Sequence, residues 1–71
     1  MNGIEIYWKS GIMADGFETD GRQAAEQLLR QVGQAIERGD RTITLPRWNG
    51  ARLVVLDSVE SVRLIQESVR A

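Results

Sequence analysis

The side chains that could do chemistry are few and scattered along the chain. Lys9 and Ser10 are adjacent, and a serine needs a base of this kind to act as a nucleophile. Three carboxylates follow, Asp15, Glu18 and Asp20, and carboxylate oxygens bind hard cations. Their spacing does not match an EF-hand, which needs acids at alternate positions and a distant glutamate. The chain has no cysteine and no histidine. We therefore predict a protein that is not an enzyme and has no metal site and no cofactor.

Two arginines flank a tryptophan near a predicted turn, as Arg47, Trp48 and Arg52. An exposed aromatic ring beside arginines can stack on a base and contact phosphate. The formal net charge of −1, however, gives no general attraction to nucleic acid or to an anionic membrane. Tryptophan, tyrosine and arginine are also enriched at protein interfaces. We favour contact with another protein, with a small nucleic-acid-binding regulator as the alternative.

The clearest element that positions these side chains is a helix over residues 21–38. Asp20 is a suitable N-cap, Gln23 completes a capping box, and Gly39 stands where a helix-ending glycine belongs. At 100° per residue, seven apolar side chains share one arc and polar side chains fill the other half, so one face is buried. The apolar positions are Ala24, Ala25, Leu28, Leu29, Val32, Ala35 and Ile36. Gly33, at the border, costs about 1 kcal/mol relative to alanine.

Strands are expected on both sides of this helix. Residues 4–9 alternate apolar and polar, which is typical of a half-buried strand. A turn is predicted at residues 10–11, and residues 12–14 resume an extended run. A second turn signal at Asp15-Gly16 precedes a short strand over residues 17–19.

A hairpin is expected after the helix. The strand over residues 42–45 is limited by Pro46, and the Asn-Gly pair at 49–50 is typical of a hairpin turn. A two-residue turn at that pair would put the proline where hydrogen bonds should be exchanged. We therefore predict a three-residue loop, which pairs Leu45 with Leu53.

Residues 53–56 are apolar at every position, and such a strand is usually covered on both faces. One helix covers only one face of a sheet. We expect the other face to be covered by the C-terminal segment or by a second copy, and we predict a homodimer. The candidate interaction surface comprises Tyr7, Arg47, Trp48, Arg52, Val54 and Leu56.

The segment from Asp57 to Ala71 supports two interpretations. As a strand, residues 61–66 alternate between two faces. As a helix, Asp57 would be the N-cap, and an apolar stripe would run from Val59 to Val69. The many β-branched residues favour the strand.

The predicted fold is a single α+β domain over residues 1–71. It has an antiparallel sheet of four or five strands in β-β-α-β-β order, with one amphipathic helix on one face. The longest apolar run is four residues, far below the roughly 20 needed to span a membrane, and the N-terminus does not look like a signal peptide. We expect a cytoplasmic protein. Eight arginines against one lysine suggest a GC-rich bacterial or phage genome, and residues 39–65 resemble small bacterial and phage proteins that end in a hairpin.

Overall fold

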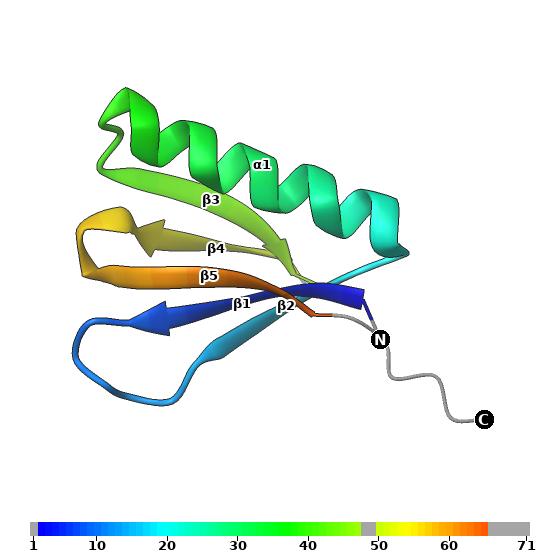
Figure 1. Cartoon of the computed structure of the whole chain (residues 1–71), viewed down its shortest axis with the longest axis horizontal. Helices are drawn as coiled ribbons and strands as arrows, with labels where there is room; N and C mark the ends of the chain where they lie inside the picture. Colours follow the sequence, from blue (N-terminus) through cyan, green and yellow to red (C-terminus); the bar gives the residue numbers. More distant parts are fainter. Residues whose placement is uncertain (1, 48–49, 66–71) are drawn as a thin grey trace.

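The order of elements follows the predicted β-β-α-β-β pattern (Figure 1). The computed structural model describes residues 2–47 and 50–65. Its elements are β1 (Asn2–Trp8), β2 (Asp15–Thr19), α1 (Arg22–Arg38), β3 (Thr42–Arg47), β4 (Gly50–Val55), the 3₁₀ turn η1 (Leu56–Ser58) and β5 (Val59–Ile65). The predicted small α+β fold is thereby confirmed.

The strands form two antiparallel sheets. One has the order β2-β1-β5, and the other is the β3–β4 hairpin. Strand β1 is central because it pairs with β2 on one side and with β5 on the other. Its alternate residues Ile4, Ile6 and Trp8 face the core and are buried. Ile4 lies opposite Phe17 of β2 on one side and Leu64 of β5 on the other. The three-stranded sheet therefore joins the start of the described chain to its end.

One apolar core lies between the sheet, the helix and the inner side of the hairpin. Its buried residues are Ile4, Ile6, Trp8, Phe17, Leu28, Val32, Ala35, Leu45, Val54, Leu56 and Val59. The predicted helical arc is wider than the buried face, because Ala24 and Ile36 are exposed. The helix thus leaves apolar surface uncovered on either side of its contact with the sheet.

The helix ends as predicted but begins differently. Gly39 adopts a left-handed conformation with φ of 81°, and its amide donates to the Ile36 carbonyl, while the Asp40 amide donates to the Ala35 carbonyl at 3.0 Å. This closes the last turn with paired backbone hydrogen bonds. The predicted N-cap is wrong: Gly21 occupies that position, and no side chain of the described residues forms a capping hydrogen bond there.

The predicted turn at Asp15-Gly16 is also wrong, because both residues belong to β2. They pair with Ile6 and Glu5 of β1. The whole segment from Lys9 to Ala14 forms the connection, so residues 12–14 do not extend a strand. The turn that starts it is closed by a hydrogen bond of 3.0 Å from the Gly11 amide to the Trp8 carbonyl.

The hairpin register differs by one residue from the predicted one. Arg47 pairs with Gly50, and Leu45 therefore pairs with Arg52 instead of Leu53. The two residues between the paired ends, Trp48 and Asn49, lie outside the described residues. A shift of one residue turns each side chain of β4 to the other face.

The C-terminal segment is a strand over Val59–Ile65, and the alternative helix is wrong for these residues. Pairing with β1 provides its backbone hydrogen bonds. Residues 66–71 lie outside the described part of the chain. Within the described residues, no helix is long and apolar enough to cross a membrane.

Candidate interaction surfaces

A charged cluster joins the hairpin to the three-stranded sheet. Asp15, at the start of β2, accepts a hydrogen bond of 2.8 Å from the Trp8 indole nitrogen. Its other carboxylate oxygen lies 2.9 Å from Arg52 and 3.7 Å from Arg47. The Arg47 guanidinium lies 4.7 Å from the centre of the Phe17 ring, and that of Arg52 lies 5.7 Å from the Trp8 ring. Each arginine thus contacts both a carboxylate and an aromatic ring.

The charge of Asp15 is favoured by these neighbours. Partial burial acts to raise the pKa of this carboxyl group. The hydrogen bonds from Arg52 and Trp8, together with the positive charges of Arg52 and Arg47, outweigh that effect and hold the pKa below its usual value. The ionised carboxylate is therefore the form that ties the hairpin to the sheet.

The predicted arginines are thus engaged within the chain. The ion pairs of Arg47 and Arg52 with Asp15 would have to break before the full positive charge of both arginines could bind a phosphate group. The Arg47 Nε atom is buried and has no hydrogen-bond partner among the described residues. Trp48, the third member of the predicted hairpin tip, lies outside the described residues.

Tyr7 lies on the face of the three-stranded sheet opposite the core. Its hydroxyl donates a hydrogen bond of 2.9 Å to Glu5, which also lies 3.4 Å from an Arg63 nitrogen. The hydrogen bond to Glu5 is the main reason that the pKa of Tyr7 is raised. This uncovered face is polar around Tyr7, in contrast to the apolar face predicted from the sequence.

Val54 and Leu56 do not line an uncovered face, and this expectation is corrected. Both are buried in the core. Because of the one-residue shift in register, their neighbours Leu53 and Val55 point outward instead. The sequence analysis did not identify Leu53 and Val55 as surface residues. The fully apolar run at residues 53–56 indicated only that one apolar face of β4 would lie outside the core.

Leu53 and Val55 belong to an exposed apolar surface, which we call the β4 patch: Ile12, Leu53 and Val55. Their exposed fractions are 66% for Ile12, 62% for Leu53 and 46% for Val55. All three line one hollow, together with Trp8, Lys9, Ser10, Arg52, Asp57 and Ser58. The adjacent Met13 is 86% exposed. Large apolar side chains gathered in this way usually mark a contact site.

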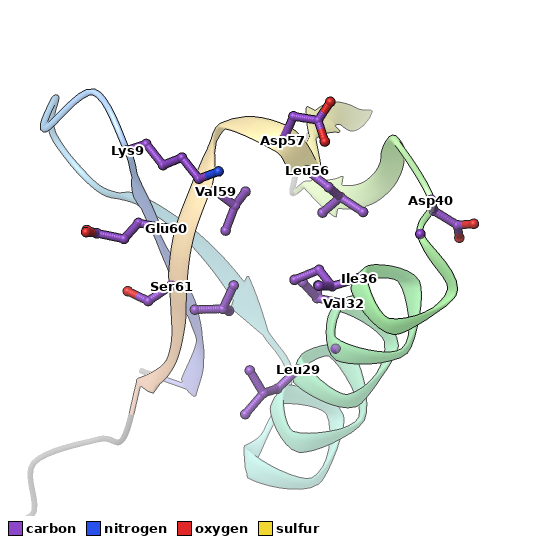
Figure 2. A pocket seen from close by; sticks show the side chains of 13 residues that line it. Lys9, Leu29, Val32, Ile36, Asp40, Leu56, Asp57, Val59, Glu60 and Ser61 are labelled. Carbon is purple, nitrogen blue, oxygen red and sulfur yellow. The ribbon is translucent and has the colours of Figure 1, made fainter.

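A second hollow separates the helix from β5 (Figure 2). We call it the α1–β5 groove, and its apolar lining residues are Leu29, Val32, Ile36, Leu56, Val59 and Val62. Helical side chains and strand side chains point toward each other across it in Figure 2. Its volume of about 560 Å³ lies within the roughly 300–1,000 Å³ of ligand pockets.

No cluster of three or more acidic side chains among residues 2–47 and 50–65 could hold a metal ion. Asp15 serves the two arginines instead. No protein-family model matches the chain, and no curated protein and no solved structure matches it either. The geometry of the two apolar surfaces is therefore the basis for inferring a function.

Proposed function

We propose that this protein is a small, non-catalytic interaction module that forms a homodimer through the β4 patch and binds another protein. The observation that carries the proposal is the outward direction of Leu53 and Val55 beside the exposed Ile12. A chain of 71 residues without cysteine has few other ways to add stability beyond a small core.

The chemistry around the β4 patch suits a second copy of the same surface. The charged residues that line the hollow are Lys9, Arg52 and Asp57, and Arg52 is already paired with Asp15. Two such surfaces meeting about a two-fold axis bring little net charge together. Thr44 of β3 lies directly opposite Leu53 and adds an uncharged side chain at the edge of the β4 patch. Burying the apolar side chains then contributes about 25 cal/mol for each Å² removed from water.

The proposal is tested by measuring molar mass in solution across a concentration series, by light scattering after size exclusion. We expect a dimer for the natural sequence and a monomer for Leu53→Glu, because the buried carboxylate would have no partner. Gln34→Glu adds the same charge on the exposed side of α1 and is the matched control; it should remain dimeric. A natural sequence that is monomeric at every concentration, or a Leu53→Glu variant that dimerises equally well, would overturn the proposal.

The nucleic-acid alternative is separated by a DNA column. Retention that falls steeply with salt would favour that alternative over protein contact. The ion pairs of Arg47 and Arg52 with Asp15 support the lower rank we give it. A cytoplasmic location and a bacterial or phage origin belong to the same proposal, on the sequence grounds given above.

A further inference from the structure

Strand β5 offers a free edge beside the α1–β5 groove. In the described residues its only hydrogen-bonded neighbour is β1. Alternate backbone amides and carbonyls of an antiparallel edge strand point away from its neighbour and can pair with a further strand. The groove lies along this edge and is closed on its far side by the helix (Figure 2). An added strand would therefore fill the groove as it extends the sheet.

The apolar side chains of the groove are incompletely buried by the chain itself. Ile36 is 48% exposed, although it lies on the apolar arc of the helix, and Leu29 and Val62 are only partly buried. All three line the groove. An extended segment presents alternate side chains to one face, so every second residue of an added strand would contact this lining.

Gly33 is a second, independent sign that the groove is kept open. It lies inside α1 and lines the groove, yet a Cβ atom at this position would meet no atom of the fold outside the adjoining helix backbone within 4 Å. Its backbone has no positive φ. The fold thus gains nothing from glycine here, while glycine in a helix costs about 1 kcal/mol relative to alanine. Occupation of the groove by another chain would explain the missing side chain.

The charged residues at the groove indicate what charge a bound segment should carry. Its charged lining residues are Asp40, Asp57 and Glu60 against the single Lys9. Arg38 lies 2.7 Å from Asp40 and partly neutralises it, which leaves an excess of one negative charge among these residues. The carboxyl end of the helix lies at the Asp40 end of the groove and adds partial negative charge.

We propose that the α1–β5 groove binds an extended segment of another protein, in which apolar residues alternate with lysine or arginine. The segment pairs with the edge of β5 through backbone hydrogen bonds and places its apolar side chains against Ile36, Leu29 and Val62. Its basic side chains point to the opposite side, away from the helix, where the Glu60 side chain also points in Figure 2.

This site is separate from the β4 patch. The linings of the two hollows share only Lys9 and Asp57. Binding of a basic segment therefore does not depend on the proposed homodimer, and each proposal can fail while the other stands. Leu53→Glu should abolish the dimer and leave binding at the groove unchanged.

The test uses a fluorescein-labelled peptide of alternating valine and lysine, titrated with the full chain and followed by fluorescence anisotropy. Amide chemical shifts should change along β5 and along the groove side of α1. A valine–glutamate peptide of equal length should bind at least about tenfold more weakly, as should the lysine peptide methylated on alternate backbone nitrogens. Equal binding of the three peptides, or no binding of the lysine peptide, would overturn the proposal.

Gly33→Leu is the decisive variant, because Gly33 lines the groove and a Cβ atom there meets open space, so that the longer side chain would occupy the groove. We expect at least about a tenfold loss of affinity for the lysine peptide, with a melting temperature no lower than that of the natural sequence. Gln34→Leu, on the exposed side of the helix, is the matched control and should bind as before. Undiminished binding by Gly33→Leu would show that the peptide occupies another surface.

Discussion

The helix and the hairpin are attached to the three-stranded sheet in different ways. Among the described residues, the helix packs on the sheet through the apolar side chains of Ala25, Leu28, Val32 and Ala35. The hairpin has apolar contacts too, but the Asp15 carboxylate also binds Arg47 and Arg52. Apolar contacts are insensitive to pH and ion pairs are not, so the two attachments should respond differently to the solution. The hairpin carries Leu53 and Val55, which makes the presentation of the β4 patch dependent on charge.

The largest effect is expected in the apolar attachment. Ile6 is fully buried under the helix, and Ile6→Ala should reduce the free energy of unfolding by about 2–5 kcal/mol through lost contacts and the cavity left behind. Urea denaturation followed by circular dichroism measures this loss. Gln34→Ala, on the exposed side of α1, is the control and should change stability by less than about 0.5 kcal/mol. A loss below about 1 kcal/mol for Ile6→Ala would contradict the assignment of the core.

A smaller loss is expected at the hairpin attachment. Asp15→Ala removes the acceptor of Trp8 and the carboxylate partner of both arginines. Because the cluster is partly exposed, we expect a loss of about 1–2 kcal/mol in the same denaturation experiment. Asp15→Asn should lose less, since its amide oxygen still accepts from the indole. Both variants remove the charge, so equal losses would mean that the hydrogen bond to the indole contributes nothing. No loss for Asp15→Asn would mean that charge contributes nothing to this attachment.

The pH dependence should separate the two attachments further. The pKa of Asp15 is lowered on folding. Its contribution to the free energy of unfolding is therefore fully present above its unfolded-state pKa of 3.8, and it is lost as the pH falls through the lower pKa of the folded state. The natural sequence should therefore lose more stability than Asp15→Asn when the pH is lowered from 6 through this window. Urea titrations at several pH values measure the difference. Parallel pH profiles for the two proteins would contradict a lowered pKa.

The smallest effect is a gain at the helix. Gly33→Ala should raise the free energy of unfolding by about 0.5–1 kcal/mol, because the new methyl group meets open space and alanine favours the helix. Thermal melting at neutral pH measures the gain, and it should be unchanged by salt. A destabilised Gly33→Ala variant would show that the groove side of α1 is more tightly packed than the structure indicates.

Much of the fold follows from local sequence patterns. The alternation in β1, the amphipathic period of α1 and the glycine that ends it all predicted the observed elements. The Asp15-Gly16 pair misled because its local preference for a turn was overridden by pairing with β1 and by the interaction of Asp15 with the arginines. Asp20 misled because the helix begins one residue later, with Gly21 at the N-cap. Local propensity is a weak guide where a tertiary contact competes with it.

The candidate surfaces were harder to predict than the elements. The apolar run at residues 53–56 correctly indicated that both faces of β4 are apolar, but the hairpin register decides which pair is exposed. A change of one residue in the turn shifts the register by one residue. The local argument about Pro46 selected a register that pairs Leu45 with Leu53, whereas Leu45 pairs with Arg52. The charged cluster depends on Asp15 and Arg52 meeting in space, which no local pattern reveals.

The central position of β1 has a consequence for the order of folding. It pairs with β2 next to it in the chain, but also with β5, so that Gly3 lies opposite Ile65. Closing so long a loop costs entropy before the contacts form, and folding slows as the sequence separation of its contacts increases. The β1–β2 hairpin and α1 can form early, while the second edge of β1 waits for β5 to be synthesised and docked. During that interval the exposed edge is open to pairing with other nascent chains, which makes the docking of β5 the step at which folding competes with aggregation.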